Sequence, residues 1–390
     1  MRARHTRLLA EVAVYSLVVL ILTGVFLLFH FDPDMTQVVY NGSYTPLRDV
    51  PASKAFASTL AVSLEVRGGL LVRQLHHWAT LVFVAAICLY LLGLFFTGVF
   101  RRTWVIWIGL LTLSMAAGVT GSILPDDMLS GGSLGLIQGV TQSIPLVGTF
   151  LTGLMFGDGV PGDRIIPVFY WLHVLLLPAV MVGMLAVGRR SFTRHRYSPA
   201  LFFATCGVLA LLATVAQINP IWLYGPYRPG VISSGAVPGW YMGFLDGALR
   251  IMPAWEPVVG GHPVSLSILI PALVVPGAFF TVLAAYPLLD RRISRAARNA
   301  VGAAGMTFYV VLWAAASNDQ LAYYFHLSLF AVTWFFRVAV FVAPAVAFEV
   351  TRRLCLALRQ QEREEAEHGV ETGSVSRTPE GEYIEEHTYA

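Results

Sequence analysis

Residues 70–100 read LLVRQLHHWATLVFVAAICLYLLGLFFTGVF. Arg73 is the only Asp, Glu, Lys or Arg in this segment, which exceeds the ~20 mostly apolar residues that cross a bilayer as a helix. His76 and His77 lie near its start. We therefore predict a membrane-spanning helix that carries ionisable groups, and such groups within a membrane are rare and usually functional.

The rest of the chain has the same character. Of its 390 residues, 56% are hydrophobic and 13% are charged, whereas soluble domains carry about 25% charged residues. An ordinary soluble protein is thus excluded. The 3 cysteines form no CxxC, CxxCH or zinc spacing, so we expect neither a disulfide framework nor covalently attached heme. Eight apolar segments predict an all-α integral membrane protein with eight transmembrane helices: 8–30, 70–100, 104–124, 165–187, 200–223, 266–289, 301–317 and 322–350.

The distribution of arginine predicts the orientation of these helices. No A-x-A cleavage signature follows the first segment, so we interpret it as a retained helix rather than a signal peptide. Basic residues collect in alternate connections, which the positive-inside rule places in the cytoplasm together with both termini. The long loops 31–69, 125–164 and 224–265 are then outside the cell membrane. The basic groups are Arg2, Arg4 and Arg7; Arg101 and Arg102; Arg189, Arg190, Arg194 and Arg196; Arg291, Arg292, Arg295 and Arg298; and Arg352, Arg353 and Arg359.

We divide the chain into three parts. Residues 1–199 form an N-terminal four-helix domain, residues 200–354 a second domain of four helices, and residues 355–390 a charged cytoplasmic tail. The outer loop 224–265 carries Pro238-Gly239-Trp240-Tyr241, followed by Phe244, Leu245, Ala248, Ile251 and Met252 at helical spacing. This pattern predicts a short amphipathic helix at the interface, and its alternative role is a lid over helix ends. We find no nucleic-acid signature and expect no nucleic-acid partner.

Two histidines lie at matched depth in the predicted membrane. His76 is about seven residues, or ~10 Å, into the second segment, and His173 is about eight residues into the fourth, which runs in the same direction. Two imidazoles that face each other across a helical bundle can hold an iron porphyrin axially. The alternative is two unrelated histidines that hydrogen-bond to neighbouring helices. His77 points about 100° away from His76 on a helix, and we assign it a packing or hydrogen-bonding role.

Several ordered motifs resemble the cytochrome b subunit of actinobacterial cytochrome bc complexes. The resemblance implies eight transmembrane helices with two stacked hemes inside the first four. It also implies menaquinol oxidation at the outer side and a dimeric complex with a Rieske iron–sulfur protein, a cytochrome c subunit and membrane lipids. The motifs are residues 21–26, 40–44, 46–47, 67–69, 73–78, 124–127, 129–131, 172–178, 238–256 and 368–373.

The family pattern is only half present. In the family, helices two and four each carry a second histidine about 14 residues after the first, and helices one and three carry glycines about 14 apart, which places each pair on one helix face. The outer set implied by the resemblance is intact: His76 and His173 as iron ligands, Gly24 and Gly121 beside the porphyrin, and Arg73 for a propionate. The inner positions hold Tyr90, Val187 or Gly188, Ala10, Trp107 and Gly93 instead. We predict one b heme on the outer side and no inner heme. The alternative recruits Tyr90 or His195 as substitute ligands.

The quinol-oxidation motif also departs from the family. In the family the motif reads Pro, an acid, an aromatic residue and Tyr. This chain retains Pro238, Trp240 and Tyr241, and Gly239 replaces the acid that would accept a quinol proton. The remaining candidates are a water chain or one of four carboxyl groups, among which spacing does not choose: Asp126, Asp127, Asp246 and Glu256.

The leading functional hypothesis is a translocase-type quinol–cytochrome c oxidoreductase subunit that oxidises menaquinol. Without the inner heme a gap of ~20 Å remains, so we expect the usual return of electrons to an inner quinone site to fail. The alternative is a catalytically degenerate, heme-binding scaffold or assembly subunit of a respiratory complex. A transporter is a third class, suggested by Arg337 in the last segment, although an arginine paired to backbone carbonyls or a lipid headgroup is the interpretation we prefer.

Overall fold

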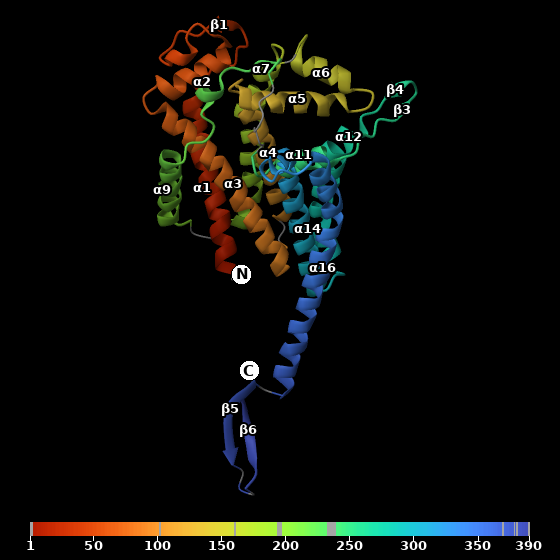
Figure 1. Ribbon diagram of the computed structural model, residues 1–390. Helices are drawn as coiled ribbons and strands as arrows, with labels where there is room; N and C mark the ends of the chain where they lie inside the picture. Colours follow the sequence, from red (N-terminus) through yellow and green to blue (C-terminus); the bar gives the residue numbers. More distant parts are fainter. Residues whose placement is uncertain are drawn as a thin grey trace.

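A computed structural model describes residues 3–100, 103–159, 161–192, 197–231, 239–368, 370–377, 379 and 381–388. Most of these residues are helical (Figure 1). The long helices are α1 (Ala3–Leu28), α3 (Gly69–Thr97), α4 (Trp104–Ile123), α7 (Ile165–Trp171), α8 (Leu177–Phe192), α9 (Pro199–Val215), α13 (Val275–Asp290), α14 (Arg295–Ala315) and α16 (Leu329–His368). A π-helical turn, Leu172–Leu176, makes α7 and α8 continuous, and Ile270–Val274 likewise joins α12 (Leu266–Leu269) to α13.

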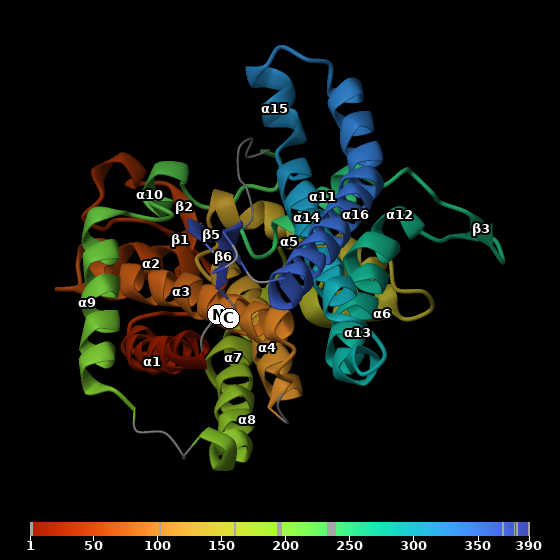
Figure 2. The same cartoon turned by 90° about the horizontal axis from the view of Figure 1, so that it is seen from below.

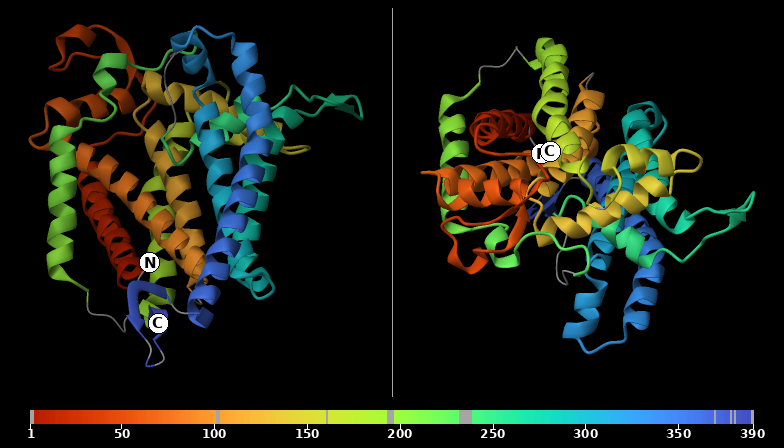
Figure 3. Two further views of the ribbon diagram at one scale, coloured as in Figure 1. Left: turned by 60° about the horizontal axis from the view of Figure 1, so that its bottom comes forward. Right: turned by 90° about the horizontal axis from the view of Figure 1, so that it is seen from above.

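Shorter elements gather mostly at one end of the bundle (Figure 1). The short helices are α2 (Lys54–Leu64), α5 (Met128–Gln142), α6 (Gly148–Phe156), α10 (Ile221–Tyr224), α11 (Gly243–Ile251) and α15 (Asn318–Tyr324), with a 3₁₀ turn at Thr45–Leu47. Three antiparallel hairpins pair β1 (Gln37–Val39) with β2 (Pro51–Ser53), β3 (Val258–Val259) with β4 (His262–Pro263), and β5 (Val370–Arg377) with β6 (Tyr383–Thr388). We call the end that carries α2, α5 and α6 the loop end. The opposite end, with the N-terminus and the projecting half of α16, is the tail end (Figures 1 and 3).

Six described helices are long and apolar enough to cross a membrane, and the pair α14–α15, bent by 63°, raises the count to seven. α9 is apolar but shorter. The prediction of a multi-pass, all-α membrane protein is therefore confirmed in class, whereas the predicted count of eight spans is not confirmed.

Two helices have boundaries that differ from those predicted by hydropathy. The segment 200–223 forms α9 only to Val215, and a separate short helix, α10, begins at Ile221. Between them the backbone of residues 216–219 is hydrogen-bonded to side chains of α3: Trp78 donates to the carbonyl of Ala216, and Gln74 pairs with the N–H and carbonyl of Ile218. The last segment was expected to begin at residue 322, but the chain turns at 325–328 and α16 begins at Leu329. His326 has a φ of 53° in this turn, so one uninterrupted helix cannot pass through it.

Two helical groups form the interior. α1, α3, α4 and α8 enclose an apolar core that contains Phe83, Ile87, Leu110 and Met181. α11 packs against α14 and α16 through a second core. The hairpin of β3 and β4 projects sideways from the bundle (Figure 2).

Candidate functional site

The structure brings the two predicted histidines together. His76 on α3 and His173 in the π-helical turn face each other with ring centroids 6.0 Å apart and ring planes at 66°. Metal–imidazole nitrogen bonds are about 2 Å long, so one metal atom bound by both rings would span about 4 Å between their nitrogens. A centroid separation of 6.0 Å leaves this space.

A proline explains the local geometry at His173. Pro178 has no backbone N–H, so the normal helical hydrogen bond to the carbonyl of Val174 cannot form. The N–H of Leu177 bonds instead to the carbonyl of Leu172, five residues earlier. Such π-bulges are frequent at functional sites, and this one carries His173.

Hydrogen bonds fix the tautomer of both rings. Nδ1 of His173 lies 3.0 Å from the carbonyl oxygen of Ala117, which can only accept, so Nδ1 carries the hydrogen. Nδ1 of His76 lies 2.9 Å from Oγ1 of Thr23. That hydroxyl already donates to the carbonyl of Val19 at 2.7 Å, and so it accepts from His76. In both rings Nε2 keeps its lone pair, which is the form that binds a metal.

Sequence reasoning missed the two threonines beside these rings. Thr120 Oγ1 lies 3.4 Å from Nδ1 of His173, much as Thr23 lies beside His76. The signal was available, because each threonine precedes a predicted glycine and is separated from its histidine by 53 residues.

The predicted glycines contact the same rings. A Cβ atom at Gly24 would lie 3.4 Å from Cε1 of His76, and one at Gly121 would lie 2.5 Å from Cε1 of His173. Real Cβ atoms do not approach other atoms below 3.0 Å, so Gly121 admits no side chain unless the ring moves. The close approach of α4 to His173 therefore depends on the missing side chain at Gly121, whereas Gly24 packs less tightly against His76.

Arg73 lies three residues, or one helical turn, before His76. Its Nη2 donates to the carbonyl of Asn219 at 3.1 Å. Its Nη1 is buried and has no hydrogen-bond partner among the described residues. A buried, unpaired guanidinium nitrogen is costly and is satisfied by an anion.

The motif in the loop before α11 reaches the same bundle. The hydroxyl of Tyr241 lies against Gly118 of α4, where any Cβ would clash with it. Gly118 is less than one turn from Gly121, the residue against His173. Tyr309 donates a hydrogen bond to the carbonyl of Trp240 and holds the loop in place. Pro238 lies outside the described residues.

The predicted amphipathic helix is confirmed as α11. Its apolar residues Phe244, Ala248 and Ile251 pack against α14 and α16. Arg337 donates from Nε to the carbonyl of Ile251 at 2.7 Å, and its guanidinium lies 4.9 Å from the ring centre of Trp334. The interpretation of Arg337 as paired to a backbone carbonyl is therefore confirmed.

Comparison with known proteins agrees with this geometry. Residues 81–200 match the family model described as "Cytochrome b(N-terminal)/b6/petB". The chain is 41% identical to the "Cytochrome bc1 complex cytochrome b subunit" of Streptomyces coelicolor, over 97% of this chain and 77% of that protein. The protein of the same name from Mycobacterium leprae gives the same identity and coverage.

The chain belongs to the cytochrome b subunit family of cytochrome bc1 complexes. The family resemblance stated above is thereby confirmed. A solved structure titled "Hyperthermophilic respiratory Complex III" matches with a TM-score of 0.63 at 14% identity, over 90% of this chain and 91% of that one, which supports the fold.

The residues at the loop end of this cytochrome b fit a b heme. The paired imidazoles, each with its Nε2 lone pair free, suit the iron, the two glycines leave room beside the rings, and Arg73 offers an unpaired donor for a propionate. These are the residues that the sequence assigned to the outer heme.

The corresponding inner positions do not fit a second heme. The rings of Tyr90 and Trp107 lie 4.5 Å apart and are 5% and 1% exposed, within the apolar core of the first bundle. Val187 is 81% exposed and points away from the bundle. His195 lies outside the described residues.

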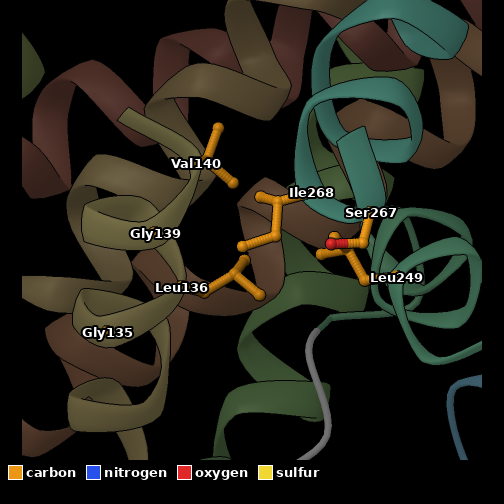
Figure 4. Close-up of a pocket in the computed structure, with 7 residues that line it drawn as sticks. All are labelled: Gly135, Leu136, Gly139, Val140, Leu249, Ser267 and Ile268. Carbon is orange, nitrogen blue, oxygen red and sulfur yellow. The ribbon is translucent and has the colours of Figure 1, made fainter. Parts of the chain in front are cut away.

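A cavity of about 280 Å³ opens beside α11 at the loop end. Figure 4 shows Leu136 and Val140 of α5 facing Ile268 of α12 across it. Leu249 of α11, Ser267, Gly135 and Gly139 complete the lining. It is an apolar space of the kind that takes a small ligand ring.

The four candidate proton acceptors differ in their surroundings. Asp246 forms an ion pair with Arg250 at 2.9 Å, and Arg250 also contacts Asp319 at 3.1 Å. Glu256 is exposed. Asp126 and Asp127 are 4% and 2% exposed. The last two are therefore the buried carboxyl groups at the loop end.

Proposed function

We propose that this cytochrome b oxidises menaquinol at its loop end and passes an electron to a single b heme held by His76 and His173. It does so as a subunit of a quinol–cytochrome c oxidoreductase, in a dimeric complex with a Rieske iron–sulfur protein and a cytochrome c subunit. The observation that carries this proposal is the facing histidine pair with both Nδ1 atoms hydrogen-bonded. The heme, when bound, supplies a one-electron acceptor.

The loop end is the outer side in this proposal. The tail end carries Arg7, the arginines between α13 and α14, and those in the second half of α16. By the positive-inside rule this end faces the cytoplasm, and both termini lie there. The quinol site, the histidines and the cavity then share the outer leaflet.

Tyr241, Trp240 and the cavity provide the quinol site. Burial raises the pKa of Tyr241, so its hydroxyl stays protonated and can donate a hydrogen bond to a quinone oxygen. The contact of this hydroxyl with Gly118 places it less than one turn from the glycine against His173. The mostly apolar lining of the cavity suits an isoprenoid quinone.

A single heme changes what the complex can do. Tyr90 and Trp107 fill the inner position, so an electron at the outer heme has ~20 Å to cross to the tail end. We propose that it passes to another partner, or that the complex uses a pathway without bifurcation. Steady turnover that responds normally to inhibitors of an inner quinone site would contradict this.

A scaffold is the second candidate, favoured by the filled inner site and by Gly239 in place of an acid. Replacing His173 by Ala separates the two functions. In the purified complex, we expect His173→Ala to abolish menaquinol-dependent reduction of the b heme, with Gly183→Ala on the same helix as control. Retained quinol oxidation in the His173→Ala complex would overturn the redox role.

A further inference from the structure

Asp126 and Asp127 form an unusual buried acidic pair between α4 and α5. Asp126 is held in a left-handed conformation with φ of 49°. Its carbonyl accepts from the N–H of Tyr227 at 2.9 Å, and the N–H of Met128 donates to Gly225 at 3.1 Å. The segment 225–227 therefore holds the backbone on both sides of Asp127 in place.

Each carboxyl group is only half satisfied. Oδ2 of Asp126 accepts from Oγ of Ser53 at 2.6 Å, while Oδ1 is buried without a partner in the described part of the chain. Oδ1 of Asp127, the N-cap of α5, accepts from Oγ of Ser130 at 2.6 Å. Oδ2 of Asp127 is buried and has no hydrogen-bond partner among the described residues. Two ionised carboxylates in this state are expensive, and a proton on one of them lowers the cost.

The charged neighbours come from three elements. Arg73 of α3 attracts Asp127, and its Nη1 is the unpartnered buried donor described above. His77 lies beside Arg73 on α3. Tyr227 of the segment 225–227 faces Asp126. Lys54 follows Ser53 in sequence, but its ammonium pairs with Asp34 at 2.7 Å and does not neutralise the aspartates.

These surroundings raise the pKa values of both carboxyl groups. Burial, reinforced by the charge of Asp127, raises the pKa of Asp126 to about 6, against the opposing hydrogen bond from Ser53. Burial also raises the pKa of Asp127, although hydrogen bonds from Ser130 and the charge of Arg73 act in the opposite direction.

We propose that Asp126 and Asp127 share a proton-binding site coupled to the redox state of the iron between His76 and His173. The proposal rests on the proposed function. The link is Arg73, which attracts Asp127 and lies one helical turn from His76. In a low-dielectric interior, a unit change of charge at the iron changes the proton affinity of the carboxyl groups near this arginine.

The proton and electron balance as follows. With the heme bound, the carboxylate pair would take up one proton for each electron held there, one O–H bond would form, and no net charge would be added. When the electron leaves, that O–H bond breaks and the proton passes to the outer solution. Oxidation of a quinol by two electrons releases two protons: one binds to the carboxylate pair with the electron that reaches the heme, and the other passes to the outer solution with the electron that goes to the Rieske protein. The pair thus takes the role of the acid that is missing at position 239. It lies at the start of α5, about 12 Å along the helix from Gly135 in the cavity lining.

The test is a spectroelectrochemical titration of the b heme in the purified complex between pH 5.5 and 8.5. One proton per electron predicts that the midpoint potential falls by about 59 mV per pH unit over part of this range, because a tenfold change equals 59 mV for one electron. Asp126→Asn and Asp127→Asn should each flatten this dependence. Glu256→Gln, an exposed acid of another outer loop, should leave it unchanged.

Ser53→Ala keeps both carboxyl groups and covers the case in which the Asn variants lose heme. Removing the hydrogen bond that favours the Asp126 carboxylate should move the bend in the potential–pH curve to higher pH. A potential independent of pH in the wild type, or a wild-type curve in heme-loaded Asn variants or in Ser53→Ala, would overturn the inference. A wild-type complex without b heme would instead overturn the proposed function.

Discussion

Gly121→Ala offers a sharp test of heme binding, because the structure supplies the size of the effect. The added Cβ would lie 2.5 Å from Cε1 and 3.0 Å from Nδ1 of His173. Ordinary carbon contacts are about 3.5–4.0 Å, so the ring must move by about 1 Å. Nδ1 is tied to the carbonyl of Ala117, and such a shift breaks this bond or tilts Nε2. Losing a partner of this kind typically costs 10–100-fold in metal affinity.

We therefore expect Gly121→Ala to weaken heme binding by about 10–100-fold. Gly24→Ala should be much milder, since its Cβ would lie 3.4 Å from His76 and needs a shift of a few tenths of an ångström. Gly183→Ala on α8 is the matched control, because nothing lies within 4 Å of its Cβ position. The assay is titration of heme into the apoprotein, followed by Soret absorbance. Wild-type affinity in Gly121→Ala, or a larger loss in Gly24→Ala, would refute the reasoning.

Three further predictions follow from other parts of the structure. Thr23→Val removes the acceptor for Nδ1 of His76 and should weaken heme binding by about 10–100-fold and change the g-values of the oxidised heme, as measured by EPR; unchanged values would contradict the tautomer assignment. Trp107→Ala leaves a cavity in the core and should lower the free energy of unfolding by about 3–5 kcal/mol without loss of the b heme, which thermal unfolding and heme content would show together. Asp126 has a higher pKa folded than unfolded, so its contribution to stability is present at low pH and is lost as pH rises from about 4 to about 6; the Tm should fall over this window, and Asp126→Asn should reduce the fall.

Hydropathy predicted the helices of this protein better than their ends. Each apolar segment contains a helix, because burying a backbone in lipid requires its hydrogen bonds to be internal. The ends depend on local features that a hydropathy window averages away, such as the α3 side chains that bind the backbone after α9 and the left-handed conformation of His326 before α16. This is why the segment boundaries were less accurate than the fold class.

Part of the candidate site could likewise be predicted from the sequence, and part required the structure. Matched depth along two helices was enough to predict that His76 and His173 face each other. The equal spacing of 53 residues from each histidine was a signal for Thr23 and Thr120, but whether each hydroxyl reaches the ring depends on the rotation of neighbouring helices. The choice of Asp126 and Asp127 over Asp246 required knowing which carboxyl groups are buried and which already have a cationic partner. The contact of Tyr241 with Gly118 joins segments far apart in sequence and could not be predicted.

The central claim is that one b heme is bound per chain, between His76 and His173. The most direct measurement is the ratio of heme b to polypeptide in the purified chain, from the pyridine hemochrome spectrum and amino-acid analysis. We predict a ratio of one, with a low-spin spectrum that disappears in His76→Ala and in His173→Ala. A ratio of two, or a heme that survives both substitutions, would contradict the account.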